Sequence, residues 1–179
     1  MEYTWYTIVE KSEEILQGDF IPECPIIIPP SSISDDDDEI NADIQLIDSV
    51  IMSQSCDLSN QKIEIVLVCP ILTLKTFLDS LPSDQSGTSK AKSKTIDNLK
   101  KGNLPSYHLL NKFGSYLEDY QVVDFRNVYG IHITSLKGIC KTLDKRIRLL
   151  PPYREHLSQA FARYFMRVGL PQDLKVEGY

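Results

Sequence analysis

Two apolar, β-branched segments, residues 44–52 and 63–71, constrain the fold of this chain most strongly. The polar residues 53–62 separate them and are rich in side chains that hydrogen-bond to nearby backbone. Two such segments joined by a polar stretch predict an antiparallel β-hairpin. Because both segments are almost continuously apolar, we expect both faces of the hairpin to be covered. The hairpin should form the buried centre of the domain.

Shorter patterns predict the rest of a mainly β domain of the α+β class. Residues 20–28 are apolar but include Pro22 and Pro25, which cannot donate ladder hydrogen bonds, so this segment should be an edge strand or an extended segment. The segment after Pro152 is the clearest amphipathic helix, because its apolar residues share one face. Further strands are expected at residues 3–9, 107–110, 120–125 and 145–150, and short helices at residues 74–81, 96–101 and 134–143.

Two segments have too few apolar residues for a packed element. Residues 30–43 include five consecutive acids from Asp35 and should form a disordered acidic loop. Residues 82–95 are rich in Ser and Lys and should form a flexible loop. No internal repeat is visible, so residues 1–179 are expected to form a single domain.

The charge of the chain is unevenly distributed along the sequence. The net charge is −6, yet residues 1–60 contain 14 acids and one base, and the remainder carries an excess of bases. A basic surface attracts phosphates or an acidic partner even in an acidic protein, although solvated loops would give the same counts. The four scattered cysteines predict reduced thiols, and no apolar run approaches the roughly 20 residues of a membrane span. With no signal-peptide pattern, a cytoplasmic location is expected.

Three motifs occur in an informative order. Gly18-Asp19 opens a strand, residues 49–53 form an apolar strand that ends in a serine, and residues 70–73 close the next strand with Pro-Ile-Leu-Thr. This succession resembles the MazF/PemK family of toxin ribonucleases, over less than half of the chain. The resemblance implies an SH3-like β-barrel with long insertions and a C-terminal helix. It also implies metal-independent cleavage of single-stranded RNA, and dimers that bind an antitoxin segment in a groove.

The family's chemistry needs a cation beside the scissile phosphate and a hydroxyl that orients or relays a proton. By resemblance, Thr73 matches the hydroxyl position, and Ser53 at the end of the preceding strand is a second candidate. Where the family has its arginine, this chain has Asp48, which would repel a phosphate. The family's reaction is therefore disabled unless Lys62, Arg126 or an arginine of the final helix supplies the cation.

The polar segment after the first hairpin strand is the most distinctive local string. Cys56 would be a nucleophile if one of the three histidines lay beside it. Alternatively, Asp57 and its neighbours cap backbone donors while Cys56 packs inward as a small apolar side chain. Gln54, Cys56 and Asp57 are therefore candidate binding residues. Cys56, Cys69 and a histidine do not have metal-ligand spacing, so no metal or other cofactor is expected.

One flank of the final helix is basic. His156, Arg163 and Arg167 align there, and they would bind phosphate or an acidic partner, or else form the solvated shoulder of a core helix. The lysines between residues 90 and 101 add a second basic segment, but no aromatic residues are interleaved with them to stack on bases.

Two functional hypotheses follow. The first is a binding or regulatory module of a bacterial stress or phage-defence system, which holds a protein partner or single-stranded RNA, with a homodimer as one expected assembly. The second is a metal-independent endoribonuclease with a relocated cation. A guanidinium within about 4 Å of the Thr73 hydroxyl would favour the enzyme. A groove covered by Asp48 and the acidic loop would favour a basic protein partner.

Overall fold

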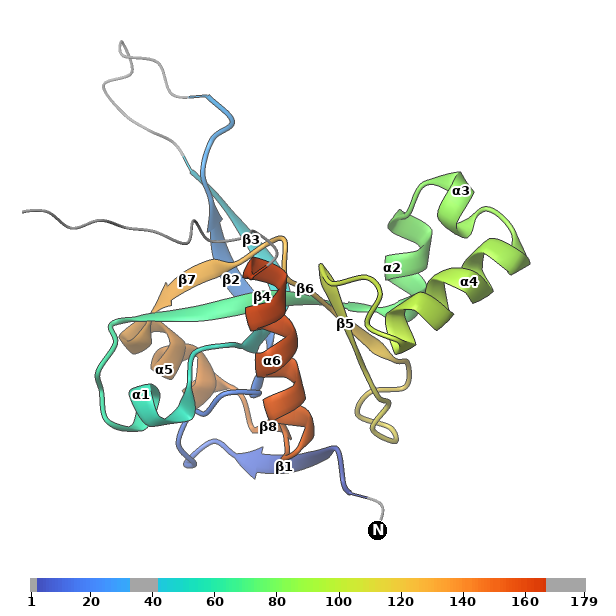
Figure 1. Ribbon diagram of the computed structural model, residues 1–179. Helices are drawn as coiled ribbons and strands as arrows, with labels where there is room; N and C mark the ends of the chain where they lie inside the picture. The colour runs from blue at the N-terminus through green and yellow to red at the C-terminus, as the bar shows by residue number, and fades with distance from the viewer. Residues whose placement is uncertain (1–2, 33–41, 167–179) are drawn as a thin grey trace, which may run out of the picture.

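The computed structural model describes residues 3–32 and 42–166, and it shows an α+β protein with mostly antiparallel strands (Figure 1). The strands are β1 (Tyr6–Glu10), β2 (Phe20–Ile28), β3 (Asp43–Ile51), β4 (Ile65–Thr73), β5 (Tyr107–Leu110), β6 (Gln121–Asp124), β7 (Tyr129–His132) and β8 (Lys145–Leu149). Strands β1 and β8 form one sheet. The larger sheet has the order β2-β3-β4-β6-β5, and β7 also pairs with β4. Within the described residues neither sheet closes on itself.

The helices follow or connect the strands. They are α1 (Ser55–Ser59), α2 (Leu74–Ser80), α3 (Ser83–Ser86), α4 (Ser89–Lys100), α5 (Ile133–Thr142) and α6 (Tyr153–Phe165). Helices α2, α3 and α4 lie together beside β5, whereas α5 lies at the other side of the molecule (Figure 1). None of the helices in the described part of the chain is long and apolar enough to cross a bilayer.

The predicted hairpin is confirmed as an antiparallel pair of β3 and β4, with Ser49 opposite Pro70 and Ile51 opposite Val68. The expectation that both of its faces are covered is wrong at the start of β4, where Ile65 and Leu67 are 53% and 40% exposed, and at the start of β3. Ile44 and Leu46 there are 68% and 64% exposed. This part of β3 pairs with β2 alone and extends beyond the end of its pairing with β4.

A bulge explains the irregular pattern of β2. The pairing moves from Ile21 opposite Ser49 to Cys24 opposite Ile47, so two residues of β2 face Asp48 alone. Glu23 adopts a left-handed φ of 47°, and its N–H donates to the Asp48 carboxylate at 2.9 Å. The extra residue keeps both Ile21 and Cys24 in the core. As predicted, β2 is an edge strand.

Successive residues of the hairpin alternate between two cores. Val50 and Cys69 point to the core that α6 covers, where Leu157 is fully buried. Ile51 and Val68 point to the opposite core, beneath α5. A third cluster, which includes Phe77, Leu99 and Val122, joins α2 and α4 to the sheet.

The prediction of a flexible loop at residues 82–95 is wrong, because α3 and most of α4 occupy it. The Thr88 hydroxyl accepts a hydrogen bond from the Ala91 N–H and so caps α4. The buried residues of α4 are only Thr95 and Leu99, an apolar stripe too narrow to stand out among its lysines. Most of the predicted acidic loop, residues 33–41, lies outside the described residues, and Asp43 already belongs to β3.

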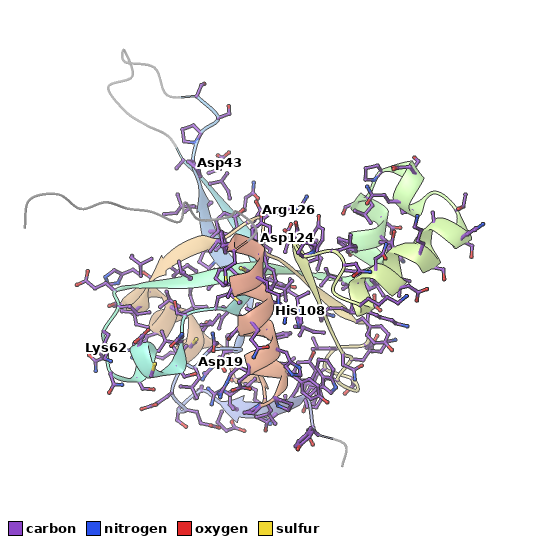
Figure 2. The ribbon with its side chains drawn as sticks, in the orientation of Figure 1. Asp19, Asp43, Lys62, His108, Asp124 and Arg126 are labelled. Atoms are coloured by element: carbon purple, nitrogen blue, oxygen red, sulfur yellow. The ribbon has the colours of Figure 1, made fainter. Side chains whose placement is uncertain are left out.

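Gly18 and Asp19 join the two sheets. The Gly18 N–H donates to the Ile51 carbonyl and the Gly18 carbonyl accepts from the Leu149 N–H, both at 2.9 Å. Gly18 has a φ of +83°, and an added Cβ would lie 3.0 Å from the Leu149 Cβ, so only glycine fits. The fully buried Asp19 carboxylate accepts hydrogen bonds from the guanidinium groups of Arg146 and Arg148 on β8 (Figure 2).

Candidate functional site

The polar segment after β3 is held by local hydrogen bonds. The Ser53 hydroxyl accepts from the Leu67 N–H at 2.8 Å, and the Lys62 N–H donates to the Asp57 carbonyl at 2.9 Å. The Gln54 carbonyl accepts from the Asp57 N–H at 3.1 Å and starts α1. These residues shape the connection between β3 and β4, and their side chains do not converge on a cavity.

Cys56 fits neither alternative predicted for it. Its side chain is exposed on α1 and does not pack inward. Its sulfur lies 3.6 Å from the Gln54 Oε1 and 3.8 Å from the Asp57 Oδ1. No histidine contacts it among the residues that the structure describes, so the arrangement provides no base for a nucleophilic thiol.

Thr73 caps a helix. Its hydroxyl accepts from the Thr76 N–H at 3.1 Å and shares a hydrogen bond with the Thr76 hydroxyl at 2.8 Å. In the described part of the chain, no arginine or lysine side chain forms a hydrogen bond with it. Ser53 bonds to Leu67, six residues before Thr73 on β4, which separates the two predicted catalytic hydroxyls by about 20 Å. The structure therefore does not bring the predicted catalytic residues together.

Asp48 is exposed and stabilises the bulge of β2 through Glu23. It also lines a cavity of about 410 Å³, whose walls include the apolar Phe20, Ile71 and Ile147. Lys62 is exposed at the end of the connection after α1, and Figure 2 shows it far from Arg126 and His108.

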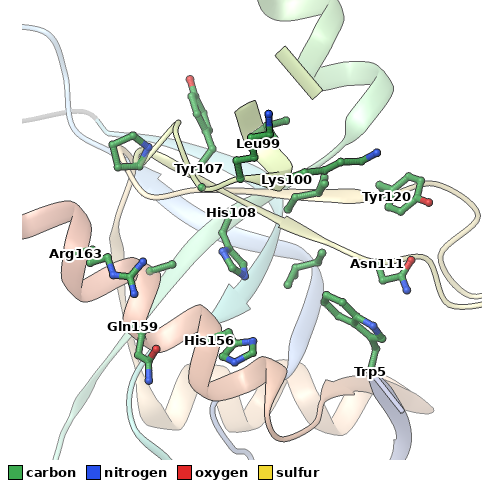
Figure 3. A pocket seen from close by; sticks show the side chains of 16 residues that line it. Trp5, Leu99, Lys100, Tyr107, His108, Asn111, Tyr120, His156, Gln159 and Arg163 are labelled. Atoms are coloured by element: carbon green, nitrogen blue, oxygen red, sulfur yellow. The ribbon is translucent and has the colours of Figure 1, made fainter. Parts of the chain in front are cut away.

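A cavity of about 660 Å³ opens between β5, the end of α4 and one face of α6 (Figure 3). We call it the basic cleft. Its lining includes three Lys or Arg residues, two histidines, three aromatic residues, two side-chain amides and no Asp or Glu. These polar and aromatic residues are Trp5, Lys100, Lys101, Tyr107, His108, Asn111, Tyr120, His156, Gln159 and Arg163.

Helical geometry gathers the polar residues of α6 at the cleft. His156, Gln159 and Arg163 follow the i, i+3, i+7 spacing of one helix face, while Leu157 is buried in the core. Leu99 anchors the last turn of α4, so Lys100 and Lys101 reach the cleft from the other side. Among the described residues none of the three cations forms an ion pair, which leaves their charges available to a ligand.

His108 extends from β5 toward the helix that carries His156 (Figure 3). Its ring is half-buried and stacks at 6.4 Å from the ring of Phe125. Burial and, to a smaller extent, the charge of His156 together lower the pKa of His108 to about 4. His108 is therefore neutral at pH 7, with one nitrogen that donates a hydrogen bond and one that accepts.

Arg126, a predicted source of the relocated cation, is already paired. Its guanidinium makes hydrogen bonds of 2.7 and 3.0 Å with the buried Asp124 carboxylate, and it lies 4.8 Å above the Tyr107 ring. Hydrogen bonding to Asp124 raises the pKa of Arg126. This pair fixes Tyr107 at the wall of the cleft and adds no free charge to it.

Of the predicted site residues, His156 and Arg163 lie in the basic cleft. Arg167 lies outside the described residues. The sequence patterns missed Trp5, Tyr107, His108 and Tyr120, because they come from segments far from α6. The sequence shows the lysines before Gly102 as a basic segment, but the aromatic side chains that line the cleft with them belong to other elements.

No protein-family model matches this sequence, and a search of curated proteins finds no similar one. Among the described residues, no group of three or more His, Cys, Asp or Glu side chains is placed to hold a metal ion.

Proposed function

We propose that this protein is a binding module that holds single-stranded RNA in the basic cleft. The observation that carries the proposal is the composition of the described cleft wall: three unpaired cations, two imidazoles and three aromatic rings, with no carboxylate. In a chain with a net charge of −6, a concave surface without acids is a local attractor for phosphate.

Cations and aromatic rings together favour single strands. Lysine and arginine side chains follow the phosphate backbone, and exposed bases stack on aromatic side chains for about 1–3 kcal/mol per base. A volume of about 660 Å³ lies within the usual range for ligand pockets, so the cleft accepts a short piece of unpaired strand. Asn111 and Gln159 add amide donors and acceptors that can bond to base edges.

The resemblance to MazF/PemK toxins supports RNA as the ligand, because members of that family act on single-stranded RNA. An SH3-like barrel and a role in a toxin–antitoxin or phage-defence system belong to this proposal. Binding here is independent of Thr73, because its hydroxyl caps α2. An acidic protein segment is the competing ligand for the same cations.

Fluorescence anisotropy with a labelled RNA of about 12 nucleotides tests the proposal, a length within the usual footprint of such sites. Arg163→Glu should weaken binding at least about tenfold and reduce the salt dependence, because a phosphate contact is lost. Lys137→Glu is the matched control, because Lys137 is an exposed lysine on α5, the helix that covers the other core.

Equal affinities for the Arg163→Glu and Lys137→Glu proteins would contradict the proposal. The proposal would also be contradicted if the wild-type protein bound a labelled poly-glutamate peptide and did not bind the RNA. The latter result would identify the cleft as a site for an acidic protein segment.

A further inference from the structure

The two histidines of the basic cleft have different surroundings. His108 is half-buried on β5 against Phe125, whereas His156 is exposed on the first half of α6, edge-on to Tyr153 at a ring distance of 6.1 Å. Both imidazoles line the same cavity as three unpaired cations. We propose that the protein cleaves the RNA held in this cleft, with His108 and His156 as general base and general acid. This inference rests on the proposed function.

The titratable groups around the pair are arranged for such roles. Tyr107 precedes His108 on β5, and the Asp124–Arg126 pair lies at the end of β6. Lys100 and Lys101 line the cleft at the end of α4, Tyr120 just before β6, and Arg163 on α6. Tyr153 and the Arg154–Glu155 pair adjoin His156. Two carboxylates adjoin the pair: Asp124 accepts hydrogen bonds from Arg126, and Glu155, which precedes His156 on α6, accepts one from Arg154 at 2.7 Å. Each of these carboxylates is paired with a guanidinium, so the unpaired Lys100, Lys101 and Arg163 give the cleft its excess of positive charge.

Unequal environments assign the two roles. Burial and the charge of His156 keep His108 unprotonated at neutral pH, so it can accept a proton. Two protonated imidazoles in one cleft repel each other, so one is protonated more easily than the other. A pair of titratable groups whose environments differ in this way is the usual basis for separate acid and base roles.

The reaction balances with the groups at hand. His108 removes the proton of a ribose 2′-hydroxyl, and the 2′-oxygen attacks the adjacent phosphorus. The bond from phosphorus to the 5′-oxygen of the next nucleotide breaks, and His156 gives its proton to that oxygen. The products are an RNA with a 2′,3′-cyclic phosphate end and an RNA with a free 5′-hydroxyl. A proton passed from His108 back to His156 through solvent restores the starting state.

The cations of the cleft stabilise the transition state. The attacked phosphate gains negative charge, which Arg163, Lys100 and Lys101 can neutralise in a partly enclosed cavity. A bound phosphate also favours the protonated form of His108, which makes His108 a stronger base in the complex than in the free protein.

The test measures binding and cleavage separately on the same RNA. In buffer with EDTA, wild-type protein should convert the RNA to fragments with 2′,3′-cyclic phosphate ends. His156→Gln should lower the cleavage rate by about 10²–10⁴-fold while the anisotropy Kd changes by less than about threefold. Because His156 is exposed, the His156→Gln protein should fold. His108→Asn is the second variant, and circular dichroism checks that it folds. His132→Gln, which changes the remaining histidine outside the cleft, should cleave like wild type.

An RNA with 2′-O-methyl groups throughout should bind but remain intact, because no nucleophile is available. Failure of the wild-type protein to bind RNA would reject the proposed function itself. Binding without cleavage, or cleavage that survives in both the His156→Gln and His108→Asn proteins, would overturn the histidine pair and leave the binding function standing.

Discussion

Burial holds the pKa of His108 at about 4 in the folded chain, whereas an exposed histidine titrates at about 6.5. Between these pH values the unfolded chain binds one more proton at this position than the folded chain. The contribution of His108 to the free energy of unfolding therefore rises with pH from about 4 to about 6.5, and it is fully present above that range. At about 1.4 kcal/mol per pKa unit, the difference reaches about 3 kcal/mol.

Urea unfolding at pH 4.5 and pH 7 measures this effect. Wild-type protein should lose more stability on acidification than a His108→Leu variant, which keeps an apolar side chain in the same space but cannot titrate. The comparison between the two proteins removes the contribution of the carboxylates, which both share. Equal losses in the two proteins would show that His108 is not buried as described.

At the scale of single elements, Thr73 ends β4 and caps helix α2. Thr73→Ala should lower the free energy of unfolding by about 1 kcal/mol, because the Thr76 N–H loses its cap. RNA binding and cleavage should stay at wild-type levels. Chemical denaturation and the anisotropy assay check the two parts, and a loss of cleavage with unchanged stability would restore the role that the family resemblance implies. Thr73→Ser, which keeps the hydroxyl, serves as the control.

The strands were predictable from sequence, whereas α4 was not. Val and Ile are enriched in β3 and β4, and β-branched residues favour strands so strongly that their pairing could be anticipated. Helix α4 buries only Thr95 and Leu99, so its sequence resembles that of a solvated loop. Its helical state depends on Thr88 and on packing against α2 and β5, contacts that no local pattern contains.

The basic cleft was predictable only at α6. The alignment of His156 with Arg163 follows from helical periodicity, which a sequence displays directly. The cleft itself requires that Trp5, Lys100 and His108 come together from separate elements. Their proximity results from the strand order, with β5 at one edge of the larger sheet, and strand order is a tertiary property.

At the scale of the whole molecule, Asp19 connects the two sheets. The carboxylate is fully buried and bonds to two guanidinium groups of β8, and Arg146 also donates to the carbonyls of Glu13 and Glu14 at 3.0 and 3.2 Å. Asp19→Asn would leave the buried Arg146 without a charged partner, and Arg148 with only the more exposed Glu13, 3.8 Å away. Loss of one member of a buried ion pair costs about 3–5 kcal/mol, and we expect a loss of this size in thermal or urea unfolding.

Glu10→Gln provides the matched control for Asp19→Asn. Glu10 also pairs with a residue of β8, since its carboxylate lies 3.8 Å from the Lys145 ammonium, but both side chains are exposed. An exposed pair is worth at most about 1 kcal/mol, so this variant should unfold almost like wild type. Similar losses in the two variants would show that the buried cluster does not hold the sheets together.

The uneven charge of the molecule also affects how a polyanion would arrive. At 0.1 M salt the Debye length is about 10 Å, so only within about that distance of the surface does the net charge of −6 repel an approaching RNA. Only close to the basic cleft does attraction exceed this repulsion. A strand would therefore enter through one mouth, and would neither coat the surface nor slide across it. The encounter itself would discriminate in favour of flexible single strands, whose free ends can reach into a recess that a stiff duplex cannot enter.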